Sequence, residues 1–132
     1  FEIGLSEIAI REDCRLLAYS PLGFGALTGK YMDGNLPEAS RYKLYPEYAR
    51  YFQPRGVTAT LKYVALAREH GLDPAQMALA FANSRRFLTS TIIGATTTEQ
   101  LTANLASVEL TLTAEVIAAI ERIHAEDPNP AP

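Results

Sequence analysis

The pattern of hydrophobic and polar positions along this chain predicts two short strands among five helices. Residues 15–19 and Thr91–Gly94 form short apolar runs that are typical of strands. Between and around them, apolar side chains recur at helical spacing. Strands that alternate with helices favour parallel pairing through right-handed crossovers, so we expect an α/β fold. The helices are expected at residues 2–12, 57–70, 74–85, 98–106 and 114–126.

Short polar signals mark where two of these helices begin. Asp73 precedes Pro74, which is an N-cap residue followed by proline at the first helical position. Thr113 is expected to cap the last helix, which carries Glu115 in its first turn. These boundaries depend on a few neighbouring residues and need no knowledge of tertiary packing.

The stretch Ile92–Gln100 predicts a strand that turns directly into a capped helix. Gly94 carries no side chain that would keep a ligand away from the backbone. Two capping boxes overlap here, Thr96 to Glu99 and Thr97 to Gln100, so either threonine could be the N-cap. Free backbone N–H groups and the positive end of the helix dipole suit a phosphate. The alternative is an ordinary strand-to-helix turn with no ligand.

The segment from Ser20 to Gln53 is rich in glycine, proline and tyrosine and lacks sustained periodicity. We expect a long loop here. Loops of this length in compact domains are usually either functional or disordered.

The chain has 132 residues, of which 48% are hydrophobic and 20% are charged. This length and composition predict about one globular domain, residues 1–132. Two strands form a marginal sheet by themselves, and the chain opens at Phe1 inside an expected helix. We therefore expect a piece of a longer protein.

The net charge of -3 gives no basic footprint, which argues against a nucleic-acid partner. The sequence has no apolar run long enough to span a membrane and no signal peptide pattern, so we expect a cytoplasmic protein. The single cysteine, Cys14, agrees with a reducing compartment and is expected to be buried and inert.

Two longer motifs carry a resemblance to a known family. Leu17–Tyr31 and Ile92–Asn104 resemble the penultimate-strand motif and the last-strand cofactor motif of the aldo-keto reductases. Gly71–Phe81 and Pro130–Pro132 resemble the bacterial Tas-like members. The resemblance covers essentially the whole chain, but only the C-terminal part of the family, from the helix before the seventh strand.

This resemblance implies an incomplete (β/α)8 TIM barrel, comprising about the last two β/α units and the C-terminal helices. The family binds NADP(H) in an extended pose and reduces aldehydes or ketones by direct hydride transfer. In such barrels the active site lies at the carboxyl ends of the strands. The partner implied for the intact enzyme is a small-molecule carbonyl substrate, and exposed strand edges would allow association with another chain.

The resemblance also implies roles for particular residues. Tyr19 would stack on the nicotinamide ring. The alternative is that Tyr19 is only an aromatic residue at the end of a strand. Lys30 and Arg41 match basic positions of the covering loop, although they could also be two solvated cations. The implied cofactor-binding residues are Tyr19, Ser20, Pro21, Leu22, Gly23, Gly25, Lys30, Arg41, Gly94, Thr96, Thr97, Gln100 and Asn104.

Some family features have no counterpart in this sequence. Ala103 stands where some relatives carry a glutamate that contacts adenine, and the loop has no lysine-rich clamp for the 2′-phosphate. NADP rather than NAD is thus an expectation from the family. The family's catalytic Asp, Tyr, Lys and His come from its first four strands, so no catalytic residue is assigned here. His70 and His124 lie near predicted helix C-termini and are expected to be surface residues, and no metal-ligand spacing occurs.

Two alternatives remain open at this point. A shortened barrel could act as a non-enzymatic nucleotide-binding or regulatory module, as some relatives are channel-associated subunits. The chain could also be a piece with no function of its own.

Overall fold

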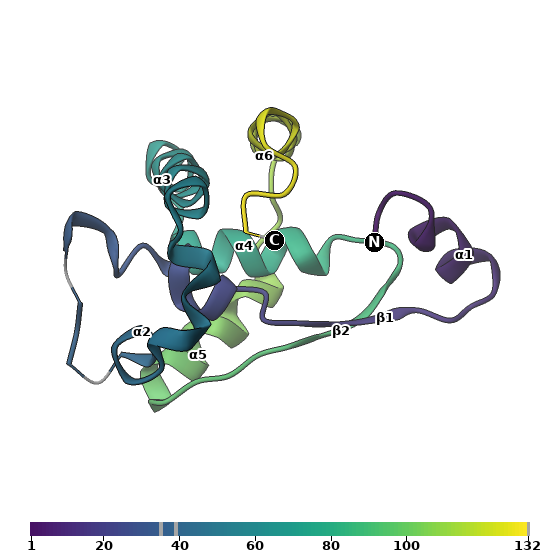
Figure 1. The fold of residues 1–132 in the computed structure, drawn as a ribbon. Coiled ribbons are helices and arrows are strands. Elements are labelled where there is room, and N and C mark those ends of the chain that lie inside the picture. The colour runs from purple at the N-terminus through teal and green to yellow at the C-terminus, as the bar shows by residue number, and fades with distance from the viewer. Residues whose placement is uncertain (35, 39, 132) are drawn as a thin grey trace.

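The computed structural model describes residues 1–34, 36–38 and 40–131 (Figure 1). It has an α/β fold in which the parallel strands β1 (Leu16–Tyr19) and β2 (Leu88–Ile92) lie beside a group of helices. The helices are α1 (Leu5–Arg11), α2 (Arg41–Leu44), α3 (Pro54–Glu69), α4 (Pro74–Asn83), α5 (Thr98–Ala106) and α6 (Ala114–Glu126), with short 3₁₀ helices η1 (Gly23–Thr28), η2 (Met32–Gly34), η3 (Pro46–Phe52) and η4 (Ser107–Glu109).

The pairing of the two strands is parallel, which confirms the prediction. Leu16 pairs with Leu88, and Tyr19 pairs with Ile92. The predicted bounds of the second strand, Thr91–Gly94, were wrong. Because β1 ends at Tyr19, just before Pro21, the residues after Ile92 have no partner on that strand, and pairing instead extends back to Leu88.

One face of the sheet is covered and the other is open. Helix α4 packs along β2 (Figure 1), and Ala18 is partly buried. On the opposite face Leu17, Tyr19 and Ile92 are 56%, 73% and 52% exposed. Since neighbouring residues of a strand point to opposite faces, this alternation follows directly from the position of α4.

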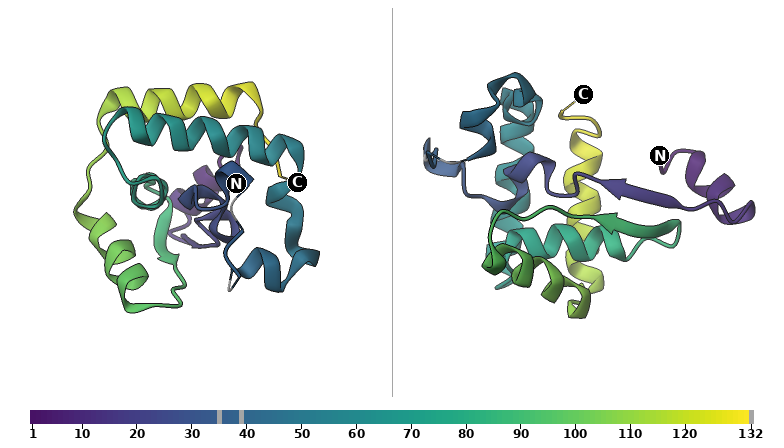
Figure 2. Two further views of the ribbon diagram at one scale, coloured as in Figure 1. Left: turned by 90° about the vertical axis from the view of Figure 1, so that its left-hand side faces the viewer. Right: turned by 90° about the horizontal axis from the view of Figure 1, so that it is seen from below.

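The core lies between α3, α4 and α6. Helices α3 and α6 run side by side, and α4 packs against α3 (Figure 2). Asp73 accepts a hydrogen bond from the backbone N–H of Gln76 (2.9 Å), and Thr113 accepts one from that of Val116 (3.3 Å), so both predicted N-caps are confirmed. The buried cluster contains Leu66, Ala67, Met77, Ala80, Leu112, Val116, Ala119 and Ile120.

The predicted long loop Ser20–Gln53 contains the short helices η1, η2, α2 and η3, which the prediction did not include. Short 3₁₀ turns need only local hydrogen bonds and leave no apolar period to read. Aromatic contacts hold the segment together: the rings of Tyr42 and Phe52 stack at 3.9 Å, and Tyr31 meets Phe52 edge-on at 5.1 Å. Residues 35 and 39 of this loop, and residue 132 of the C-terminal motif, lie outside the described residues.

The N-terminal region is less covered than its pattern predicted. The helix expected at residues 2–12 is present but spans Leu5–Arg11, and Ile3 and Ile8 are 98% and 56% exposed. The prediction that Cys14 is buried was wrong: it is exposed, because it lies in the connection between α1 and β1, away from the helical core.

Two other helices shift at their ends. Helix α3 begins at Pro54, three residues before its predicted start, because proline suits the first helical position. Helix α4 ends at Asn83 rather than at residue 85. Helix α5 has the predicted bounds, but its apolar residues Leu101 and Leu105 remain 43% and 57% exposed.

Candidate functional site

A groove of about 490 Å³ lies at the carboxyl ends of both strands. Its walls come from the end of β1 and η1, from the start of α2, from the start of α4, and from α5 with the turn that precedes it. Most of the residues singled out from the sequence line it, although they come from segments far apart in the chain. These lining residues are Tyr19, Ser20, Pro21, Leu22, Gly25, Lys30, Arg41, Gly94, Thr96, Gln100 and Asn104.

Two of the residues singled out do not line the groove. Gly23 is buried behind its wall with φ of +54°, and a Cβ atom there would lie 3.4 Å from Cδ1 of Tyr51. Thr97 is the N-cap residue of α5, and its hydroxyl oxygen accepts a hydrogen bond from the backbone N–H of Gln100. Both support the shape of the groove from outside.

The turn between β2 and α5 is fixed by Gln100. Its backbone N–H donates to Oγ1 of Thr97 over 3.2 Å, so the Thr97–Gln100 box is the one that caps the helix. Its side-chain Oε1 accepts hydrogen bonds from both the backbone N and Oγ1 of Thr96, each at 3.1 Å. A ligand that takes the N–H of Thr96 must therefore compete with Gln100.

Glu99 adds a negative charge at the same helix N-terminus. Hydrogen bonds from its own backbone N–H, and then from the Thr97 hydroxyl, hold the pKa of Glu99 below its usual range. Helix N-termini favour anions, and this one already has a carboxylate in its first turn. The sequence identified Glu99 only as half of a capping box, and the prediction did not include its carboxylate as a competitor of a bound anion.

Arg41 connects the loop side of the groove with the β2 side. Its guanidinium carbon lies 5.5 Å from the centre of the Phe24 ring, and its Nη2 lies 4.0 Å from where a Cβ atom on Gly94 would be. Ser40, which is buried, caps α2 through a 3.4 Å hydrogen bond from the backbone N of Lys43. The start of α2 thus places a cation across the groove.

Lys30 adds a second cation on the loop side. Its backbone N–H donates to Oγ1 of Thr28 (3.2 Å), and its Nζ lies 5.0 Å from the centre of the Tyr31 ring. Asp73 is the lining carboxylate, and one of its oxygens is occupied in capping α4. Together with Arg41, Lys30 makes the described lining richer in positive than in negative charge.

A further cation, Arg50, lies near the end of β1 and was missed from the sequence. Its Nη2 donates to the hydroxyl of Tyr51 over 2.7 Å. The pKa of Arg50 is raised, first by this hydrogen bond, then by the charge interaction with Tyr51, with Tyr19 contributing as well. No pattern marked Arg50, because it lies in a 3₁₀ helix within the predicted loop.

Several lining residues were not among the candidates, although half of them are direct neighbours of candidate residues in the chain. That adjacency is the signal that could have found them. The missed residues are Phe24, Thr28, Asp73, Ala75, Ile92, Ile93, Ala95 and Ala103. Within the part of the chain that is described, no three His, Cys, Asp or Glu side chains gather in a way that could hold a metal ion.

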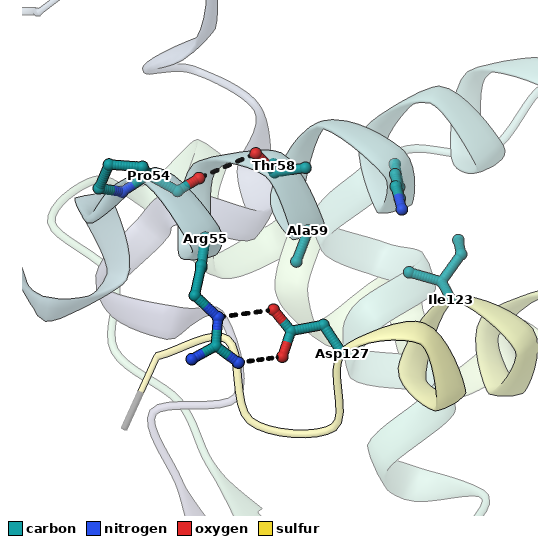
Figure 3. A pocket seen from close by; sticks show the side chains of 7 residues that line it. Pro54, Arg55, Thr58, Ala59, Ile123 and Asp127 are labelled. Carbon is teal, nitrogen blue, oxygen red and sulfur yellow. Dashed lines mark hydrogen bonds and ion pairs between the residues drawn. The ribbon is translucent and has the colours of Figure 1, made fainter.

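A second, smaller hollow lies between the start of α3 and the end of α6 (Figure 3). Arg55 reaches across it, and its Nε donates to Oδ2 of Asp127 over 3.0 Å. Lys62 pairs with Glu126 on the same seam. None of the candidate cofactor residues lies here. The charged side chains are paired with one another, and the Thr58 hydroxyl donates to the backbone oxygen of Pro54.

Comparison with known proteins identifies the family. The sequence model described as "Aldo/keto reductase family" matches residues 2–125. The chain belongs to this family. It is 48% identical over 132 residues to the protein named "Protein tas" from Escherichia coli K12. The matched region covers 100% of this chain and 38% of that protein. The Tas-like resemblance seen in the sequence is thereby confirmed.

Other members of the family are more distant. The chain is 35% identical over 125 residues to L-glyceraldehyde 3-phosphate reductase of E. coli K12, covering 90% of this chain and 36% of that protein. It is 37% identical over 114 residues to a probable voltage-gated potassium channel subunit beta of Oryza sativa subsp. japonica, covering 82% of this chain and 34% of that protein. The chain spans well under half the length of each of these relatives.

Membership of this family implies a (β/α)8 barrel and a nicotinamide cofactor. The residues that line the groove fit such a cofactor. Its volume lies within the range of about 300–1,000 Å³ that is usual for ligand pockets. The exposed backbone at Gly94 and the cations Lys30 and Arg41 suit phosphate groups.

Among the described residues, no single helix is long and apolar enough to cross a membrane. The segments Thr98–Glu109 and Ala114–Glu126 reach the required length and composition only as a pair, which is bent by 112°.

Proposed function

We propose that this chain is the cofactor-binding C-terminal portion of an NADP(H)-dependent aldo-keto reductase, an oxidoreductase that reduces aldehydes or ketones. The observation that carries this proposal is the groove, which collects candidate residues from the ends of both strands. The reductase relative from E. coli supports it. The parallel pair of strands with its helices would be the last two units of the barrel.

Each part of the groove suits one part of the cofactor. The exposed ring of Tyr19 offers a flat face for the nicotinamide, which supplies a hydride to a carbonyl carbon when bound. Lys30 and Arg41 would hold the pyrophosphate from the loop side, while Gly94 and Thr96 would hold the adenosine phosphate. Gln100 and Asn104 lie four residues apart on one helix face and would border the adenine.

The residues of this chain bind and orient, and none of them is assigned to the chemical step. Reduction of a carbonyl needs a proton donor at the developing alkoxide. Tyr19 does not suit this role, because its ring is proposed to lie flat against the nicotinamide. We therefore expect the purified 132-residue chain to show no turnover of a generic aldehyde with NADPH. Turnover would contradict this assignment.

The binding proposal can be tested on the chain itself. Titration with adenosine 2′,5′-bisphosphate, followed by NMR, should shift the backbone signals of Gly94, Thr96 and Gln100 and leave that of Glu115 in place. Binding should be weak and should fall with rising salt. Adenosine 5′-monophosphate, which lacks the 2′-phosphate, tests the preference for NADP over NAD. If the chain is folded and these signals do not move, the groove does not bind the nucleotide.

Two substitutions sharpen this titration. Thr96→Trp places a bulky ring in the turn and should abolish binding. Ala103→Glu adds a carboxylate on the adenine side and should strengthen it. Equal binding by both variants and the wild type would mean that the nucleotide lies elsewhere.

A second candidate function is a non-enzymatic nucleotide-binding or regulatory module. The relative from Oryza sativa, named as a probable channel subunit, favours it. The intact protein that contains these residues would then bind NADPH without reducing aldehydes. Measuring both binding and turnover on that protein separates the two functions.

We also propose a cytoplasmic location, a carbonyl substrate as the small-molecule partner, and association through strand edges. In the described two-stranded sheet each strand has one edge without a neighbouring strand, and such edges template pairing with other chains. Light scattering should then show a mass that rises with concentration. A constant monomer mass would contradict the association.

A further inference from the structure

We propose that Arg50 selects carbonyl substrates that carry an anionic group, a carboxylate or a phosphate, at the mouth of the groove. This inference rests on the proposed reductase function and adds the substrate class. Arg50 would be a specificity residue that contacts the far end of the substrate rather than its carbonyl.

The position of Arg50 is fixed by its neighbour. Its Nη2 donates to the Tyr51 hydroxyl over 2.7 Å, and its guanidinium carbon lies 4.7 Å from the centre of the Tyr51 ring. The half-buried Tyr51 ring in turn lies against Gly23, where a Cβ would be 3.4 Å from it. Because Gly23 follows closely after Tyr19 and Ser20, this chain of contacts holds the cation beside the carboxyl end of β1.

The charge of Arg50 is available to a ligand. Its side chain is exposed, and it donates a hydrogen bond to the neutral phenol of Tyr51. The guanidinium has five N–H donors in a planar fork that fits a carboxylate or phosphate. Among the described residues, the ion pairs that form join other cations to carboxylates and do not include Arg50. Those cations are Arg11, Arg15, Lys43, Arg55, Lys62 and Arg85.

The location distinguishes a substrate anion from the cofactor phosphates. Arg41 lies near Gly94, on the side of the groove where the adenosine phosphate is proposed to bind. Arg50 lies on the side of Tyr19, where the nicotinamide and the reacting carbonyl are proposed to be. Arg50 does not itself line the groove, but it interacts with the side chain of Tyr19, which does, so its charge lies at the edge of the groove on that side. A substrate with its anion some distance from the carbonyl matches this arrangement.

The test uses the intact protein that contains these residues and two aldehydes of nearly equal size. 4-Carboxybenzaldehyde carries the anion, and its methyl ester does not. The kcat/KM of both is measured for the wild type, Arg50→Met and Arg50→Lys. Arg68→Met, which removes an exposed arginine on the last turn of α3, is the matched control. Unfolding temperatures verify that each variant is folded.

Wild type is expected to prefer the acid over the ester. Arg50→Met should lower kcat/KM for the acid by about tenfold, as expected for loss of a charge-assisted hydrogen bond near the surface, and leave the ester within about twofold. Arg50→Lys should retain part of the preference, because it keeps the charge but not the fork. The KM for NADPH should not change.

A second measurement does not depend on turnover. Calorimetric binding of 4-(hydroxymethyl)benzoate, the product, to the complex with oxidised cofactor should weaken by a similar factor in Arg50→Met and stay unchanged in Arg68→Met.

The outcomes separate the two proposals. If the wild type reduces both aldehydes and Arg50→Met alters neither their ratio nor product binding, the role of Arg50 is wrong and the reductase function stands. If Arg50→Met instead raises the KM for NADPH, Arg50 holds the cofactor and the inference is likewise overturned. If the intact protein reduces neither aldehyde with NADPH or NADH, the reductase function fails and the inference fails with it.

Discussion

The helical side of the molecule and the open face of its sheet use similar apolar residues but bury them very differently. On the helical side, Leu79 of α4 and Val116 of α6 are each almost fully buried, at 1% exposure. On the sheet, Leu17 and Ile92 remain more than half exposed. Both regions carry strand or helix patterns in the sequence, so the pattern alone does not determine burial. Burial requires a second element to pack against, and the described chain provides one on the helical side.

The largest effect that would test this contrast is a cavity at a buried position of helix α4. Leu79→Ala should lower the free energy of unfolding by about 2–5 kcal/mol, because it removes buried contacts and leaves a space. The same change at Leu17, on the open face, should alter it by no more than about 0.5 kcal/mol. Urea unfolding of both variants measures the difference. An equal loss of unfolding free energy in the two variants would mean that Leu79 and Leu17 are equally well packed.

A close backbone contact joins the helical side to the segment that holds the groove. At Gly56 in α3, a Cβ atom would lie 2.6 Å from the carbonyl oxygen of Tyr51. Gly56→Ala should therefore cost about 1–3 kcal/mol by forcing these backbones apart, although alanine normally favours helices. Ala65→Gly, at an exposed position of the same helix, gives the ordinary propensity cost of about 1 kcal/mol. Stabilisation by Gly56→Ala in urea unfolding would rule out this contact.

Two helix caps of the same type compare the groove with the core. Thr97→Ala and Thr113→Ala should each cost about 1 kcal/mol of stability, because each removes an N-cap hydroxyl. Thr97→Ala should also weaken nucleotide binding, since Thr97 positions the turn that lines the groove. Thermal unfolding and the NMR titration measure the two effects. If Thr113→Ala weakened binding equally, the effect would be a general loss of structure.

The smallest expected effect concerns pH and the seam between α3 and α6. The hydrogen bond from Arg55, the largest cause, lowers the pKa of Asp127 below its usual value of about 4. Its contribution to stability is therefore present above the unfolded pKa and is lost as the pH falls through the folded pKa. Asp127→Asn should lower the unfolding temperature at pH 7 but not at pH 2. In an Arg55→Met background the effect at pH 7 should be much smaller, because only the backbone hydrogen bond from Asn129 and the charge of Lys62 then favour the carboxylate.

The sequence predicted best what depends on neighbouring residues. The caps at Asp73 and Thr113 and the bounds of α5 rest on local hydrogen bonds, which leave clear residue signals. The bounds of β2 were wrong because they depend on where its distant partner β1 ends. The short helices after Ser20 leave no apolar period in the sequence, and the contacts between rings that hold this segment together join residues at no regular spacing.

The candidate groove shows the same division. The residues that line it from Tyr19 to Gly25 and from Gly94 to Asn104 lie in motifs that resemble a known family, and the structure brings these two stretches together. Arg50 lies in no motif. Its place near Tyr19, at the end of β1, follows from the fold of a segment that could not be predicted in advance.

The parallel pairing of β1 with β2 also constrains the order in which the chain folds. Residues 20–87 separate the two strands, so their pairing must wait until a long loop is closed, at an entropic cost that local contacts do not carry. Helices α3 and α4 lie within that loop and can form and dock first. Contacts between residues far apart in sequence slow folding. The groove, which needs both strand ends in place, is then among the last features to form.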